Sequence, residues 1–503
     1  MNAATEAVTL PPGRRFLGHP IGLATLFFTE MWERMSFYGM RALLVLFLVS
    51  GASRGGLGLD DRTAAAIYGL YNAGTYIACL PGGWIGDRLL GAQRAVLIGG
   101  IVIACGHLLL GIAPSSAVFF VGLLVIVLGT GMLKPNASAA VAQLYPEGGA
   151  RRDAGFTLYY VGINVGATIG PLITALLAQR YGWPTGFMAA AVGMTLGVAQ
   201  FLWWRGLLGD AGRLPMAHDR DGDGSSSRLA LSWLIGAGAA VVAVVALIWR
   251  GAIAISPSVL QSISTAAVIA VAAFYFSYLL FWAGLDTVER RRVRVVAVLF
   301  LASVLFWAGY EQTGSSFNLF AERYTARTFS GFVIPAGWFQ SLNPILIIVF
   351  APVFSALWVQ LGRHNLDPSA PLKFVFGLLG MALGFIVMAA AARLVASGQQ
   401  VSPGWLTLTY MLHTFGELCL SPVGLSAVTG LVPRRFVGQS LGVWFVSISL
   451  GNLFAGRIAG EVNADQVAAM PGQYLNIFWY GAACAALLLL ALPLVRRWMG
   501  GVQ

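Results

Sequence analysis

The sequence predicts an all-α integral membrane protein. The chain has 503 residues, of which 58% are hydrophobic and only 10% are charged, and its mean hydropathy is +0.76. Soluble domains carry about a quarter of charged residues. Apolar runs of about 20 residues, the length that crosses a bilayer as a helix, recur along nearly the whole chain. A soluble fold is therefore excluded.

The apolar runs define fourteen expected membrane-spanning helices. In chain order they cover residues 21–50, 62–87, 94–112, 116–145, 154–179, 184–204, 229–249, 262–285, 295–321, 336–361, 374–395, 404–431, 436–460 and 473–495. The first 20 residues are polar and lack the continuous apolar core of a cleavable signal peptide. We therefore expect the first helix to stay in the mature protein.

The basic residues between the spans predict the orientation of the chain. With the N-terminus in the cytoplasm, twenty of the 31 Lys and Arg residues lie on the cytoplasmic side and seven on the outer side. This bias predicts a multi-pass protein of the plasma (inner) membrane with both termini in the cytoplasm. The net charge of +11 then reflects topology and calls for no nucleic-acid partner.

A polar stretch at residues 205–228 interrupts the series of spans. Its segment DRDGDG has the acidic spacing of a calcium loop, but the twelfth position is Ala230 where a bidentate Glu is needed. A flexible linker is the better interpretation. The two helices that follow it have no acid or base at mid-depth and look like spacers.

A short internal repeat relates the two halves of the chain. Residues 134–146 read KPNASAAVAQLYP and residues 421–433 read SPVGLSAVTGLVP, with the two prolines and the Ala-Val and Leu positions in register. A parallel six-plus-six repeat is typical of a major facilitator fold. We expect two six-helix bundles, at residues 1–208 and 294–503, with the linker and two additional helices at 209–293.

Eight ionisable residues fall at membrane depth within the expected spans. They are Glu30, Glu33, Arg34, Arg41, Lys134, Glu311, Glu417 and Arg457. Each would cost about 2.5–3.5 kcal/mol or more if it faced lipid, so they are expected to face one another or a wet cavity. Arg457 lies near a helix end and can extend its charge to the interface, so it is assigned no role.

The first span places its charges on one side of the helix. At 100° per residue, the four charged residues share a stripe about 140° wide with Phe37 and Tyr38. Intramembrane charges usually mark a substrate or ion pathway. The alternative is an ion-pair network that only fixes helix packing.

Lys134 and Glu417 lie at similar depth on the two helices that the repeat relates. A short zwitterion would fit between a cation and an anion so placed, unless the two charges have separate partners. Glu311 can be ionised when paired and neutral once protonated, which proton coupling requires. Asn164 and Asn343 add amides that can bind peptide groups or hold two helices together.

The remaining residues give no sign of an enzyme. No phosphate-binding GxxxxGK[ST] motif occurs, and the four cysteines lack metal-ligand spacing. No nucleophile–base pair accompanies the buried polar residues. We expect no catalytic residue, no cofactor and no metal. A membrane-embedded enzyme and a passive channel are the weaker alternatives to a transporter.

Several stretches resemble known motifs. GGWIGDRLLGAQR at 82–94 resembles the major facilitator loop motif, and EMWERMSFY at 30–38 resembles the ExxERFxYY motif of the proton-coupled oligopeptide transporter (POT) family. FTLYYVGINVGA at 156–167 and GVWFVSISLGN at 442–452 are similar to further blocks of that family, as are LKPN, FWAGYEQ, SLNP and GELCLSPVGLS. Bacterial members also carry two extra helices between the halves.

The resemblance implies a proton-coupled symporter that imports di- and tripeptides by alternating access, acting as a monomer. By motif, Glu30, Glu33 and Arg34 would form the coupling cluster with Lys134, and Arg41 and Glu311 an ion pair that opens on protonation. Arg41, Lys134 and Asn164 would hold the peptide carboxylate. The amino end and the side-chain pockets would fall to Glu417, Asn343, Ser440, Tyr38, Tyr76, Trp307 and Trp444.

The chain departs from the family pattern at two positions and lacks a histidine that animal relatives use. Met35 replaces the Phe of the ExxERFxYY motif and Phe37 replaces its first Tyr, which removes one hydroxyl from the stripe. The second span has no His, which animal relatives use, so protons would enter through carboxylates or by another route. A same-family symporter of nitrate or a peptide-like drug is the alternative function.

Overall fold

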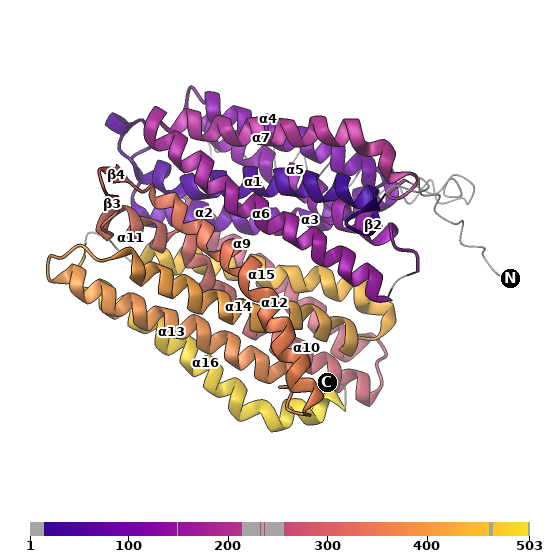
Figure 1. Cartoon of the computed structure of the whole chain (residues 1–503). Helices are drawn as coiled ribbons and strands as arrows, with labels where there is room; N and C mark the ends of the chain where they lie inside the picture. The colour runs from indigo at the N-terminus through magenta and orange to yellow at the C-terminus, as the bar shows by residue number, and fades with distance from the viewer. Residues whose placement is uncertain are drawn as a thin grey trace. The chain divides into compact units, whose positions relative to one another are not determined.

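The computed structural model describes residues 15–147, 149–213, 256–461 and 466–500, together with residues 232 and 236. Helices dominate this part of the chain (Figure 1). The strands form two small antiparallel pairs, β1 (Arg15–Phe16) with β2 (His19–Pro20) and β3 (Thr328–Phe329) with β4 (Phe332–Val333).

The helices follow the predicted spans closely. Those before the linker are α1 (Gly22–Val49), α2 (Asp61–Ile77), α3 (Cys79–Ile85), α4 (Ala92–Ile112), α5 (Ser116–Gln143), α6 (Gly149–Tyr181) and α7 (Trp183–Trp204). Those after it are α9 (Pro257–Ser277), α10 (Thr287–Tyr310), α11 (Ser316–Tyr324), α12 (Leu342–Arg363), α13 (Ala370–Ala396), α14 (Pro403–Leu431), α15 (Val437–Glu461) and α16 (Met470–Met499). The predicted span 229–249 and most of the linker lie outside the described residues.

Two predicted spans are broken helices rather than continuous ones. The second span is α2 followed by α3, and the break falls where Pro81 cannot donate a backbone hydrogen bond to Ile77. The span predicted at 295–321 is α10 and α11 joined by a 3₁₀ turn that begins at Glu311. Short 3₁₀ stretches within a helix often mark functional positions.

Local signals explain where helices begin. Asp60 precedes α2 and accepts hydrogen bonds from the Thr63 hydroxyl at 2.7 Å and from its N–H at 2.9 Å. These hydrogen bonds lower the pKa of the Asp60 carboxyl below its usual value. Asp286 and Glu289 form a reciprocal capping box at the start of α10.

Ten described helices, some with their adjoining turns, are long and apolar enough to span a membrane. Among the described helices, α1 does not meet this criterion although it has 28 residues, because every 18-residue stretch of it contains at least three charged residues. The charges in α1 must therefore be satisfied by the protein itself.

The chain divides into two compact units. Unit 1 comprises residues 1–40 and 77–256, and unit 2 comprises residues 41–76 and 257–503. The division falls inside α1, directly before Arg41, so that the second half of α1 and nearly all of α2 pack with the C-terminal half of the chain. The domain boundaries predicted at 208 and 293 follow the sequence repeat and stay a prediction.

Glycines bring α4 and α5 of unit 1 into backbone contact. A Cβ atom at Gly99 would lie 2.8 Å from the Gly129 carbonyl oxygen, and one at Gly106 would lie 2.9 Å from that of Gly122. The reciprocal positions are equally tight. Close helix crossings through small residues are typical of membrane proteins, where packing replaces the hydrophobic effect as the driving force.

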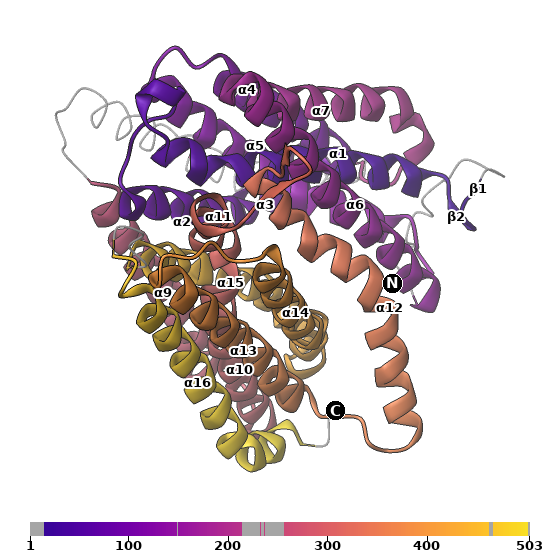
Figure 2. The same ribbon diagram turned by 60° about the vertical axis from the view of Figure 1, so that its left-hand side comes forward.

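Aromatic side chains fill the core of unit 2. The Phe317 ring of α11 lies 5.5 Å from that of Phe385 on α13, 6.4 Å from Tyr410 on α14 and 6.1 Å from Tyr474 on α16. Helix α13 packs along both α14 and α16 (Figure 2). This core holds α11, and with it the 3₁₀ turn at Glu311, against three long helices.

The additional helix α9 makes polar contacts with unit 2. The Gln261 side chain is 6% exposed and donates to the Leu453 carbonyl oxygen on α15 at 2.8 Å. It also lies beside the crossing of α2 and α15 at Gly69 and Gly456. Helix α9 is therefore integrated into the packing of unit 2 and is more than a spacer.

We expect Gly129→Leu to destabilise the protein strongly, because the added side chain would meet the α4 backbone. Overpacking of this kind costs about 1–3 kcal/mol or more. The thermal unfolding midpoint of the purified protein in detergent measures the effect. Gly362→Leu on α12 is the control, because a Cβ there meets nothing within 4 Å. Equal midpoints for the two variants would contradict the close crossing.

Candidate functional site

The first half of α1 carries a buried cluster of two acids and one base. Glu30 is 1% exposed, Glu33 is 0% exposed and Arg34 is 4% exposed. The Arg34 Nε atom lies 3.1 Å from a Glu30 carboxylate oxygen and also pairs with Glu33. The Tyr159 hydroxyl of α6 donates to Glu30 at 2.7 Å. One guanidinium thus serves two carboxylates, which leaves the cluster one negative charge in excess.

Lys134 of α5 is the second cation that the sequence predicts for this cluster. It is half-buried and lies within electrostatic range of Glu33 and Arg34. Pro135 follows it inside α5 and removes the hydrogen bond to the Gly131 carbonyl, which packs directly against Gly82 of α3. The local sequence therefore fixes α5 against α3 at the depth of Lys134.

Tyr38 and Asn164 are the two other predicted site residues of unit 1. Phe37, where the family motif has Tyr, lies under the Arg34 guanidinium at 5.1 Å, and the half-buried Tyr38 ring packs edge-on against Phe37 at 5.3 Å. The buried Asn164 amide donates to the Tyr160 carbonyl of its own helix at 2.9 Å. The side-chain carbonyl oxygen and the second N–H of that amide are available to a ligand.

The second half of α1 carries Arg41, which forms a buried ion pair in unit 2. The Arg41 guanidinium lies 2.7 Å from a Glu311 carboxylate oxygen, and both residues are below 10% exposed. It also donates to the Tyr68 hydroxyl and to the Thr313 hydroxyl, the latter at 3.3 Å. The pair predicted from the motif is therefore formed, and it joins α1, α2 and the 3₁₀ turn after α10.

Glu417 of α14 sits in a different kind of environment. It is 8% exposed, and one carboxylate oxygen accepts from the Tyr310 hydroxyl at 2.7 Å and from the Asn343 amide at 2.9 Å. Asn343 also donates to the Thr414 hydroxyl at 3.0 Å. Within the described residues no cation lies in ion-pair distance of Glu417. The site is an anion fixed by neutral donors, which suits a cationic ligand.

The predicted side-chain pocket residues of unit 2 have different surroundings. Trp307 packs edge-on against the Tyr310 ring at 5.1 Å, so it belongs to the same surroundings. Trp444 is buried against Phe374 at 6.2 Å and beside Gly424. Tyr76 is half-buried in unit 2.

Ser440 lies in contact with the additional helix. Its hydroxyl lies 2.7 Å from the Tyr275 hydroxyl of α9, and it is 4% exposed. A role for Ser440 at the amino end of a peptide stays a prediction. No contact of Ser440 with Glu417 or Asn343 is seen in the described part of the chain.

Sequence reasoning missed the tyrosines that organise these charges. Tyr159, Tyr68 and Tyr310 each place a hydroxyl on a buried charged group. Tyr310 directly precedes Glu311 and Tyr159 lies in a motif block, which are the signals that point to them. Tyr68 carries no such signal, because its role depends on the contact of α2 with Arg41 of α1 and with Gly314 of the 3₁₀ turn after α10.

Known proteins resemble this chain in sequence and in fold. A sequence model described as the POT family matches residues 93–208 and 278–477. The chain is 42% identical to a peptide transporter of Yersinia enterocolitica, and the alignment covers 98% of both proteins. This chain belongs to the POT family.

Other members of the POT family support the assignment. A di-/tripeptide transporter of Lactococcus lactis is 36% identical over 88% of this chain and 90% of its own length. A crystal structure of a POT peptide transporter in complex with sulfate has a TM-score of 0.89 at 38% identity, covering 98% of this chain and 99% of that chain. A mutant form in complex with alafosfalin has a TM-score of 0.88. The predicted family and the major facilitator fold are confirmed.

We expect Arg41→Gln to destabilise this POT family protein because it leaves Glu311 buried and unpaired. Breaking a buried ion pair on one side costs about 3–5 kcal/mol. Adding Glu311→Gln should restore most of the lost thermal stability, since no uncompensated charge remains. The midpoint of thermal unfolding in detergent reports both effects.

Arg151→Gln is the control for the Arg41→Gln variant and for its combination with Glu311→Gln. Arg151 pairs with Glu147 at 3.3 Å, but both side chains are about half exposed. Exposed pairs contribute roughly 0–1 kcal/mol, so this variant should unfold close to the parent protein. A double variant as unstable as Arg41→Gln alone would show that the pair does not act as a unit.

Proposed function

We propose that this chain is a symporter that imports di- and tripeptides together with protons by alternating access. Its relatives include proteins named as peptide transporters and as dipeptide and tripeptide permeases. The main support for the proposal is the environment of Glu417, a buried carboxylate that accepts hydrogen bonds from the Tyr310 hydroxyl and the Asn343 amide. A peptide ammonium group supplies the cation that this carboxylate lacks.

The peptide carboxylate needs a cation in turn. Lys134 and Arg41 are proposed for that role, with the carbonyl oxygen of Asn164 available to a peptide N–H. Arg41 would then exchange Glu311 for the substrate, because both are carboxylates. Trp307, adjoining Tyr310, is proposed to contact a substrate side chain, as are Tyr38, Tyr76 and Trp444.

Protons are proposed to act on the excess carboxylate of the α1 cluster. Glu30 and Glu33 share Arg34, so a proton on one of them removes the negative charge that Arg34 does not compensate. Protonation of Glu311 would likewise weaken its hold on Arg41. Each event changes which groups are paired, and a change of pairing can favour one helical arrangement over another.

The energetics suffice for concentrative uptake. One proton that moves down 100 mV releases about 2.3 kcal/mol, and each pH unit adds about 1.4 kcal/mol. Since about 1.4 kcal/mol corresponds to a tenfold concentration ratio, one proton can concentrate a neutral zwitterion tens- to hundreds-fold.

We also propose that the chain acts in the inner membrane as a monomer, with both termini in the cytoplasm.

A related substrate class is the alternative. A POT family transporter that is 31% identical to this chain has been solved in complex with 5-aminolevulinic acid. That ligand also carries an ammonium and a carboxylate group. Glu417 favours any substrate with a free amine, and it disfavours nitrate.

We expect free dipeptides to compete with labelled dialanine for uptake far better than capped ones. N-acetylation leaves Glu417 without its cation, and amidation of the C-terminus leaves a base without its anion. An unpaired buried polar group costs about 1–3 kcal/mol, so the capped peptides should compete about tenfold to a hundredfold less well. Competition in proteoliposomes measures this, and equal potency of free and capped peptides would refute the assignment.

Glu33→Gln should separate proton coupling from peptide exchange. The amide mimics the protonated acid and keeps its size, so the peptide-binding groups stay intact. We expect loss of accumulation driven by a proton gradient, with exchange of labelled for unlabelled dialanine retained. Glu417→Gln is the matched variant and should weaken both processes. Normal gradient-driven accumulation in Glu33→Gln would show that Glu33 has no coupling role.

A further inference from the structure

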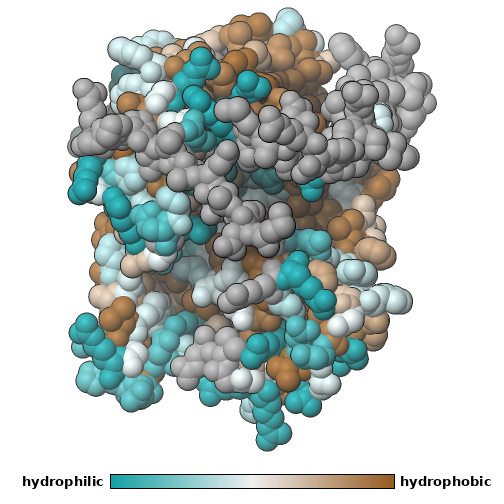
Figure 3. All heavy atoms as spheres, turned by 90° about the vertical axis from the view of Figure 1, so that its right-hand side faces the viewer, coloured by the Kyte–Doolittle hydropathy of each residue, from teal (hydrophilic) through white to brown (hydrophobic). Residues whose placement is uncertain are grey.

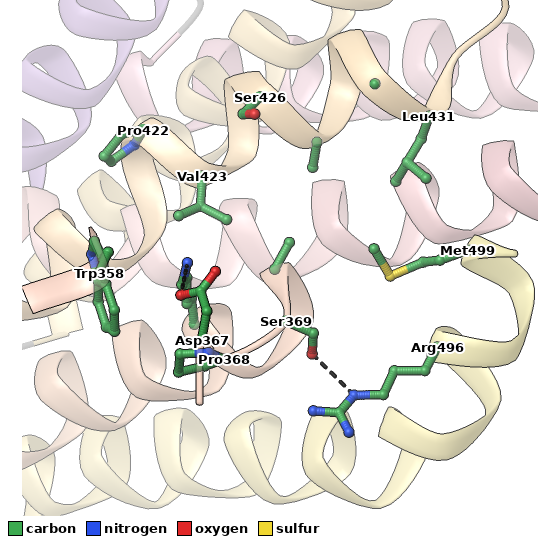
Figure 4. Close-up of a pocket in the computed structure, with 14 residues that line it drawn as sticks. Trp358, Asp367, Pro368, Ser369, Pro422, Val423, Ser426, Leu431, Arg496 and Met499 are labelled. Atoms are coloured by element: carbon green, nitrogen blue, oxygen red, sulfur yellow. Dashed lines mark hydrogen bonds and ion pairs between the residues drawn. The ribbon is translucent and has the colours of Figure 1, made fainter. Parts of the chain in front are cut away.

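A cavity of about 630 Å³ lies at one end of unit 2. It is lined by the end of α12, the loop before α13, the second half of α14 and the end of α16 (Figure 4). On α14 the lining residue Ser426 lies about 180° around the helix from Glu417. None of Glu417, Tyr310 and Asn343 lines the cavity, so it is separate from the surroundings of Glu417 described above.

Three charged side chains line this cavity. The Lys373 ammonium lies 2.8 Å from an Asp367 carboxylate oxygen and 4.7 Å from the centre of the Trp358 ring. The Arg496 Nε atom donates to the Ser369 hydroxyl at 3.0 Å (Figure 4). Two cations and one anion from three different segments of the chain thus line the same cavity.

The other walls of the cavity are apolar. Pro422 and Val423 of α14 and the buried Met499 of α16 form part of them. On α12 and α14, outside the cavity, Val353, Leu357 and Leu425 are 55%, 42% and 38% exposed. Two of the helices that line the cavity therefore also carry exposed apolar side chains.

The depth of the cavity matches the headgroup region of a bilayer. Helix α12 ends at Arg363 and α13 begins at Ala370, so the lining loop between them lies where two spans leave the membrane. Arg496 and Arg497 mark the same level at the end of α16. Figure 3 looks onto the helix ends, where hydrophilic side chains stand beside hydrophobic ones.

We propose that this cavity binds the headgroup of a zwitterionic aminophospholipid such as phosphatidylethanolamine. The phosphate lies between Lys373 and Arg496, and the ammonium group takes the place of Lys373 beside Asp367. The acyl chains run along the exposed apolar residues of α12 and α14. Asp367 is the reason to prefer this lipid over an anionic one, because a phosphate that draws Lys373 away without supplying an ammonium leaves the Asp367 carboxylate unpaired.

Native mass spectrometry of the purified, delipidated full chain tests this proposal. The protein is titrated with phosphatidylethanolamine and with phosphatidylglycerol, and we expect tighter binding of the first. Arg496→Ala should weaken that binding about fivefold, the typical contribution of one basic residue near a lipid surface. Arg497→Ala is the control, because Arg497 is exposed and does not line the cavity.

Asp367→Asn tests the preference between lipids with an isosteric change. It should reverse the order, so that phosphatidylglycerol binds the variant more tightly than phosphatidylethanolamine does. Equal effects of Arg496→Ala and Arg497→Ala, or an unchanged order in Asp367→Asn, would overturn the proposal.

Soluble competitors distinguish a lipid site from a site for a free phosphate or zwitterion. Glycerophosphoethanolamine, inorganic phosphate and dialanine should not displace the bound lipid at matched concentrations, because they lack acyl chains. Displacement by any of them at matched concentration would show that the cavity is a site for a soluble ligand, which would also overturn the proposal.

Discussion

Charge buried at membrane depth has to be compensated by other groups of the protein, and this requirement organises the described structure. Helix α1 bears four charged residues that lipid would not accommodate. Arg34 pairs with Glu30 and Glu33 within unit 1, with Lys134 in electrostatic range of Glu33, whereas Arg41 pairs with Glu311 within unit 2. Because the two units divide α1 between Met40 and Arg41, each unit compensates the charges of its own half of the helix.

Glu417 illustrates a different solution to the same problem. Its carboxylate is fixed by the Tyr310 hydroxyl and the Asn343 amide rather than by a base of the protein. Neutral donors orient the anion without cancelling its charge, so a cationic ligand gains a full electrostatic interaction. The acids of α1 already have bases, and a proton or a ligand carboxylate competes for those bases. This contrast separates the proposed substrate-binding role of Glu417 from the proposed coupling role of Glu33.

Most of the fold could be predicted because a membrane-spanning helix can be recognised from its apolar composition. The breaks at Ala78 and at Glu311–Gly314 could not, since α5 and α14 contain a proline without breaking, and the second break depends on packing between Gly314 and Tyr68. The pairs Arg41–Glu311 and Glu417–Asn343 were within reach of the sequence, because buried charges are few and need partners. The contact of Ser440 with Tyr275 was not, because no pattern shows which face of α9 meets α15.

Peptide-driven proton entry tests the coupling account most directly. Proteoliposomes with a pH-sensitive dye inside are mixed with dialanine while internal and external pH are equal and the membrane potential is clamped at zero. If proton and peptide move together, the lumen acidifies only when peptide is added, and labelled peptide appears inside at the same time. Entry of labelled peptide without acidification would contradict the proposal that these buried charges couple the two fluxes.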